Sequence, residues 1–158
     1  MTFTAKTVAE RTPVGNRTKI EENTADVHVY QTSGGFCAVM ITESKYKRLA
    51  GQGVLSKVVD DFKTRFTPTE IQEKQPGTFD WPQLKKFREE AVTAEDSNIT
   101  AVQAELDETK IVLHKTIESV LERGEKLDTL VQKSDELGLA SKGFYKHAKQ
   151  QNSCCVVM

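Results

Sequence analysis

The chain lacks several features that would place it in large classes of proteins. Its 158 residues contain no apolar run near the ~18 residues that a membrane-spanning helix needs. Residues 1–6 do not form the apolar core of a secretory signal. The formal net charge is −1, without the basic excess typical of a nucleic-acid-binding surface. We therefore expect a cytoplasmic protein with no nucleic-acid partner.

Patterns of catalytic or metal-binding residues are also lacking. His28, His114 and His147 are scattered, and neither a phosphate-binding loop nor a G-x-S-x-G motif occurs. The missing loop argues against a prenylated small GTPase as well. His114 is interpreted as a helix-flank residue rather than a ligand. We expect no enzyme, no catalytic or metal site, and no cofactor.

The first 66 residues show a mixed α and β pattern. The segment 36–42 is nearly continuous in apolar residues, which predicts burial on both faces and a packed thiol at Cys37, whereas 26–31 alternates. The sequence predicts a helix over 3–11, strands over 17–22, 26–31 and 36–42, and a helix over 46–66.

Residues 67–98 are typical of a linker. Three prolines and a glycine interrupt them, and the amphipathic stretch 81–91 is predicted to dock on a neighbouring surface or to pack locally. Asp96, Ser97 and Asn98 then offer helix N-caps.

A seam with a 3.5-residue period runs from Ile99 to Gln151 and predicts a helix packed against other helices. Glycines at 124, 138 and 143 each disfavour a helix by about 1 kcal/mol, so the isolated helix should form poorly and fold on meeting partners. The seam positions are Ile99, Val102, Leu106, Thr109, Leu113, Thr116, Val120, Arg123, Leu127, Leu130, Ser134, Leu137, Ser141, Phe144, Ala148 and Gln151.

Arg123 at the centre of this seam needs an explanation. An unpaired buried guanidinium would be destabilising by several kcal/mol, so the partner helices must offer acceptors at that level. A homodimer would bring two arginines together, whereas a mixed bundle could supply neutral amide oxygens. The alternative is that Arg123 extends to solvent at the edge of an ordinary coiled coil.

The last residues match a lipidation signal. Cys155-Val156-Val157-Met158 fits C-a-a-X with methionine at X, which favours farnesylation of Cys155. One prenyl chain anchors only marginally, so palmitoylation of Cys154 would supply the second signal. A helix over 99–151 would be about 80 Å long, and it would end two residues before these cysteines. Zipping of that helix toward its anchor would pull two membranes together.

At this point the residues resemble a known family. The segment 102–110, the motif 121–127 (Leu-Glu-Arg-Gly-Glu-Lys-Leu) and the Cys154-Cys155 tail are similar to prenylated longin-type R-SNAREs, which are synaptobrevin homologues. The resemblance implies an α+β fold: a partial longin (profilin-like) antiparallel sheet with flanking helices, followed by a long SNARE coiled-coil helix. It further implies that the chain begins within the first longin helix and lacks two strands, which would leave three strands with an unpaired edge and an uncovered apolar face.

The resemblance also implies an organisation and a function. The expected parts are a partial longin domain (1–66), a linker with a short amphipathic helix (67–98), a SNARE motif (99–151) and a lipidated tail (152–158). Arg123 would form the central ionic layer with three glutamines of syntaxin-like and related Q-SNAREs, and farnesyltransferase would modify Cys155. The protein would drive vesicle fusion in ER–Golgi, endosomal and vacuolar transport, anchored on the cytosolic face of those membranes. The alternative is a farnesylated coiled-coil adaptor that tethers vesicles without fusing them.

Overall fold

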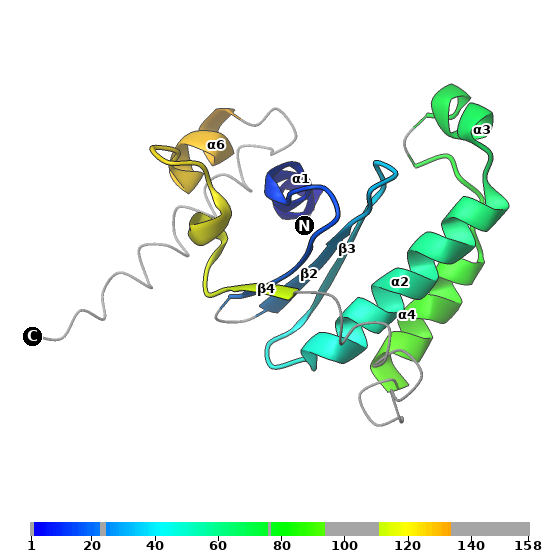
Figure 1. Ribbon diagram of the computed structural model, residues 1–158, viewed down its shortest axis with the longest axis horizontal. Coiled ribbons are helices and arrows are strands. Elements are labelled where there is room, and N and C mark those ends of the chain that lie inside the picture. The colour runs from blue at the N-terminus through cyan, green and yellow to red at the C-terminus, as the bar shows by residue number, and fades with distance from the viewer. Residues whose placement is uncertain (1, 23–24, 76, 94–110, 134–158) are drawn as a thin grey trace, which may run out of the picture.

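The computed structural model describes residues 2–22, 25–75, 77–93 and 111–133. In this part of the chain, helices and strands mix as expected for a partial longin domain (Figure 1). In order, the elements are α1 (Thr2–Arg11), β1 (Arg17–Glu21), β2 (Ala25–Gln31), β3 (Cys37–Glu43), α2 (Arg48–Arg65), α3 (Pro68–Glu73), α4 (Gln83–Thr93), β4 (Ile111–His114), the 3₁₀ helix η1 (Ile117–Val120) and α6 (Leu127–Lys133).

The sheet has one strand more than the sequence predicts. The strand order is β3-β2-β1-β4, with β2 antiparallel to both β1 and β3. Strand β4 pairs in parallel with β1, so that Arg17 lies opposite Ile111 and Ile20 lies opposite His114. The expected three-stranded antiparallel sheet is thereby corrected, because the fourth strand comes from the predicted SNARE helix.

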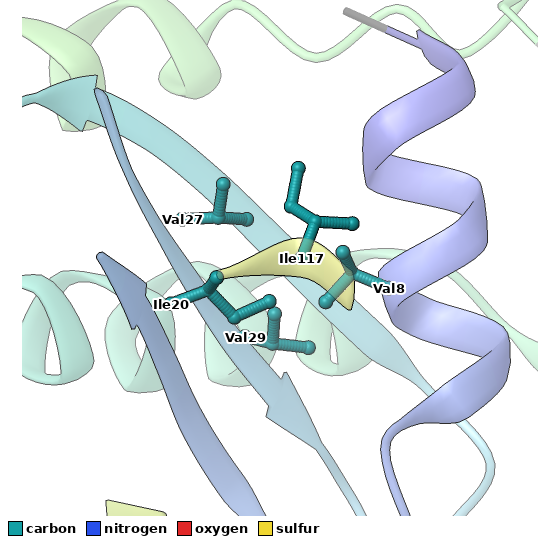
Figure 2. Packing of buried hydrophobic residues seen from close by; sticks show 5 residues of the cluster. All are labelled: Val8, Ile20, Val27, Val29 and Ile117. Atoms are coloured by element: carbon teal, nitrogen blue, oxygen red, sulfur yellow. The ribbon is translucent and has the colours of Figure 1, made fainter. Parts of the chain in front are cut away.

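The helices cover both faces of the sheet. In Figure 1, α1 lies on one face, α2 lies on the other, and α4 packs along α2. The apolar core lies between the sheet and α1, where Val8, Ile20, Val27, Val29 and Ile117 meet (Figure 2). Complete burial of such aliphatic side chains stabilises a fold by about 1.5–3 kcal/mol each.

The burial of the two longest strands is the reverse of the prediction. Strand β2, predicted to alternate, is buried on both faces from Asp26 to Val29, because it lies between β1 and β3 and between α1 and α2. Strand β3, predicted to be buried on both faces, is only half-buried, because it is the outer strand of the sheet in the described residues. Cys37 is therefore exposed at its start and is not the packed thiol expected.

The face of the sheet under α2 is polar. His28 and Gln52 are fully buried there, and the Gln52 side-chain amide donates to the carbonyls of Thr18 and Val29 at 3.1 and 3.3 Å. Gly51 makes this packing possible, since a Cβ atom there would lie 2.6 Å from His28 Cε1.

The amphipathic stretch 81–91 within the linker packs locally on α2. Trp81 Nε1 donates to Asp61 Oδ2 at 2.7 Å, and the Trp81 ring lies 5.3 Å from the ring of Phe62. Phe66 and Phe79 complete this aromatic cluster, with ring centroids 5.1 Å apart. Of the two alternatives for this stretch, docking on a neighbouring surface or local packing, the structure shows packing on α2 of the same chain.

Candidate functional site

The described part of the seam, residues 111–133, forms three short elements in place of one helix. Strand β4 is followed by η1, by a turn and by α6. This agrees with the expectation that the isolated helix forms poorly, because sheet pairing and core contacts outweigh a helix that contains Gly124. The continuous helix over 99–151 stays a prediction for the assembled bundle.

Apolar side chains attach this segment to the sheet. Ile117 is part of the core cluster, and Val120 and Leu127 pack against that cluster while half-buried. Figure 2 shows Ile117 between α1 and the strands, next to Val8. Seam residues that would face partner helices in a bundle thus face this chain's own core.

Two polar contacts hold the same segment. Arg11 at the end of α1 donates from Nε and Nη2 to the two carboxylate oxygens of Glu125, at 3.1 and 2.8 Å. The backbone N–H of Ile117 donates to Glu22 Oε2 at 3.1 Å. The hydrogen bond from Arg11 and a second one from the Glu122 backbone N–H lower the pKa of the Glu125 carboxyl. We call the Arg11–Glu125 pair the latch.

Arg123 lies in the turn between η1 and α6. The turn closes through the Glu125 backbone N–H, which donates to the Glu122 carbonyl at 3.0 Å. Gly124 adopts a φ of +94°, which a residue with a side chain rarely accepts. Arg123 is exposed on this turn, so its guanidinium is accessible from solvent.

The seam residues do not share one side in this structure. Leu113 is 48% exposed, whereas Val120 and Leu127 contact the core. Thr116 caps η1 by accepting a hydrogen bond from the Ser119 backbone N–H, and Leu130 is half-buried in α6. The other predicted site residues lie outside the described residues: Ile99, Val102, Leu106, Thr109, Ser134, Leu137, Ser141, Phe144, Ala148, Gln151, Cys154 and Cys155.

Sequence reasoning missed the residues that attach the segment most firmly. Ile117 and Val131 are buried although neither is on the seam, and Arg11 and Glu22 lie far away in the sequence. The sequence signal that could have found them is the presence of apolar residues outside the 3.5-residue seam, which indicates a second mode of packing. His114, predicted to flank a helix, lies in β4 in this structure and contacts Ser119 Oγ at 3.2 Å, so its place beside a helix stays a prediction for the assembled bundle.

Comparisons with known proteins match both the sheet-containing part of the chain and the segment that carries the seam. The synaptobrevin family model matches residues 98–156, and the regulated-SNARE-like (longin) domain model matches residues 1–88. The chain therefore belongs to the synaptobrevin family and is a longin-type R-SNARE.

Individual relatives narrow this to one branch of the family. The chain is 46% identical to "Synaptobrevin homolog YKT6" of Eremothecium gossypii, over 100% of this chain and 80% of that protein. It is 46% identical to the protein of the same name in Saccharomyces cerevisiae, with the same coverage. It is also 46% identical to "VAMP-like protein YKT62" of Arabidopsis thaliana, over 99% of this chain and 77% of that protein. The chain is thus a longin-type R-SNARE of the Ykt6 kind. Proteins of this class act in vesicle trafficking.

Proposed function

We propose that this protein is an R-SNARE whose residues 99–151 zipper with three Q-SNARE helices and drive fusion of transport vesicles with their target membranes. The observation that carries the proposal is an arginine at the centre of a seam that falls within the synaptobrevin match. In a four-helix bundle, Arg123 would donate to glutamine side chains of the partners, which are neutral acceptors suited to a buried guanidinium.

The packed segment adds a regulatory step to this function. Residues 111–114 are extended in β4 and cannot at the same time be helical, so the seam must leave the sheet before it zippers. Arg123 is already exposed in the packed state and is available for a first contact. The longin part would thereby hold the SNARE segment inactive until partners compete for it.

Membrane attachment is the second part of the proposal. None of the described helices is long and apolar enough to cross a bilayer. Farnesylation of Cys155 and palmitoylation of Cys154 would anchor the chain beside the end of the zippered helix, on the cytosolic face of Golgi, endosomal and vacuolar membranes. Farnesyltransferase would be the modifying enzyme.

Assembly with soluble Q-SNARE helices tests the proposal. The full chain mixed with three such helices should gain helix, followed by circular dichroism, and form a heat-resistant complex. Arg123→Leu should weaken that complex, and a glutamine→arginine change in one partner together with Arg123→Gln should restore it. Helix gain by the chain alone through homodimers would contradict the proposal and favour the alternative, a farnesylated coiled-coil adaptor that only tethers vesicles.

A further inference from the structure

We propose that Thr67, at the junction of α2 and α3, is the acceptor site for a protein kinase that selects a threonine followed by proline. The γ-phosphoryl group of ATP would be transferred to Thr67 Oγ1, ADP would leave, and the hydroxyl proton would pass to the general base of the kinase. This inference goes beyond the proposed SNARE function, because α3 (Pro68–Glu73) lies outside residues 99–151.

Two identical dipeptides of the chain differ in their accessibility. Threonine precedes proline twice, at Thr12-Pro13 and at Thr67-Pro68. Thr12 is 5% exposed, and its hydroxyl donates to the Val8 carbonyl at 2.8 Å. Thr67 and Pro68 are both exposed. In the folded chain, a kinase can therefore reach the second of these threonines and not the first.

The backbone at Thr67 has the conformation of a bound peptide. Its φ is −75° and its ψ is 154°, which is an extended conformation. Pro68 favours this conformation in the residue before it, because the proline ring disfavours the helical region there. Extended segments are a form in which proteins commonly recognise peptides. The acceptor residue therefore needs no backbone change of its own to enter a kinase.

The residues that follow Thr67 are held weakly. Helix α3 has no buried residue. A reciprocal capping box closes its first turn: Glu70 Oε2 accepts from the Thr67 backbone N–H and hydroxyl, both at 2.9 Å, and the Glu70 backbone N–H donates to Thr67 Oγ1 at 3.3 Å. Segments with few buried contacts open locally at a low free-energy cost. Opening of this one turn would free the hydroxyl for phosphoryl transfer.

Phosphorylation would change this capping box in a defined way. The hydrogen bonds from the Thr67 backbone and, secondly, from its side chain lower the pKa of the Glu70 carboxyl. A phosphate in place of the hydroxyl removes that side-chain donor and adds a charge of about −1.5 to −2 at pH 7 beside the carboxylate. Both changes disfavour the charged carboxylate, so the pKa of Glu70 should rise on phosphorylation.

The experiment uses the full chain, ATP and a purified cyclin-dependent kinase, which selects a proline after the acceptor residue. We expect incorporation of phosphate that mass spectrometry of proteolytic fragments locates at Thr67, with Thr12 unmodified. Thr67→Val should remove this incorporation. Pro68→Ala keeps the hydroxyl and a residue that favours the helix, and it should lower the initial rate at least about tenfold.

Two acidic residues of α3 give a matched pair of variants. Glu70→Ala removes the carboxylate that holds Thr67 and should raise the rate of phosphorylation severalfold, because the first turn opens more often. Glu73→Ala removes the same charge from an exposed position at the end of the helix and should change the rate less than about twofold. An NMR titration of the modified and unmodified chains would measure the shift of the Glu70 pKa.

Several results would overturn the inference. Absence of phosphate at Thr67 would, when a standard substrate of the same kinase is phosphorylated in the same mixture. Equal rates for Pro68→Ala and the unchanged chain would show that the proline is not read. Equal rates for Glu70→Ala and Glu73→Ala would show that the capping box does not control access. None of these measurements involves assembly with other helices, so their failure is distinguishable from failure of the proposed function.

Discussion

Gly124 bears on two conformations of the residues around Arg123, the packed turn and the proposed helix. In the packed state it takes a φ of +94°, which disfavours a residue with a Cβ atom by about 1–2 kcal/mol. In a continuous helix the same glycine is about 1 kcal/mol worse than alanine. Substitution by alanine would therefore destabilise the packed turn and stabilise the helix, and both effects shift the equilibrium toward the helix.

We predict that Gly124→Ala shifts the chain toward the helical, assembly-ready state by about 2–3 kcal/mol in total. The expected result is a rise of more than tenfold in the rate of complex formation with Q-SNARE helices, measured by stopped-flow fluorescence. Gly124→Asn is the control, because asparagine tolerates a positive φ and should raise the rate less. Equal rates for alanine and wild type would show that this turn does not limit assembly.

His28 makes the stability of the sheet depend on pH. Its pKa is lowered from 6.5 to about 4, chiefly because burial disfavours the imidazolium and secondly because Lys19 lies nearby, while Asp26 opposes the shift. Its Nε2 contacts Thr42 Oγ1 at 3.4 Å. The folded chain thus keeps this imidazole neutral at pH values where the unfolded chain protonates it.

We predict that the free energy of unfolding falls by about 3 kcal/mol as the pH falls from about 6.5 to about 4. The unfolded state binds the proton first, so the stabilisation is complete above pH ~6.5 and is lost below it. Urea unfolding across this range measures the slope. His28→Gln should flatten it, while His114→Gln should leave it; a slope unchanged by His28→Gln would contradict the assignment.

At the scale of elements, the latch connects α1 to the turn after η1. Arg11 lies outside the SNARE segment, so a change there acts on assembly only through the packed state.

We predict that Arg11→Glu, which repels Glu125, raises the rate of assembly severalfold. The double variant with Glu125→Arg should return the rate to near wild type, and this rescue separates loss of the latch from general damage to α1. Circular dichroism with Q-SNARE helices would follow both variants, and failure of the rescue would argue against the latch.

Individual elements show how far the sequence predicts this molecule. Helix α1, strands β1 to β3 and helix α2 were predicted from periodicity, because local pattern decides whether a segment is a helix or a strand. Burial of β2 and β3 was predicted the wrong way round, because it depends on strand order, which lies outside local pattern. Strand β4 could not be found, since residues 111–114 belong equally to a helical seam and to a strand of β-branched and aliphatic residues.

The candidate site was predicted only in part for the same reason. The seam and the position of Arg123 were predicted from the 3.5-residue spacing of the sequence. This spacing indicates which residues would face other helices. The contacts of Ile117, Glu22 and Arg11 belong to the other conformation, in which this segment meets its own sheet.

At the scale of the whole molecule, the proposed bundle would compete with the sheet for the same residues. Val120 and Leu127 cannot pack against the core cluster and against partner helices at once. The equilibrium therefore depends on the difference between the free energies of the two packings, and anything that binds only the extended helix shifts it. A covalent link between β4 and β1 should therefore prevent formation of the bundle.

A disulfide tests this coupling directly. Thr18 lies opposite Val112 in the β1–β4 register, so cysteines at both positions have neighbouring Cα atoms. In a chain whose Cys37, Cys154 and Cys155 are changed to serine, oxidised Thr18→Cys/Val112→Cys should lose at least about tenfold in assembly rate with Q-SNARE helices. Reduction should restore the rate, and neither single variant should respond to oxidation. Undiminished assembly of the oxidised form would mean that zippering leaves β4 on the sheet, and the inhibitory role of this packing would then be wrong.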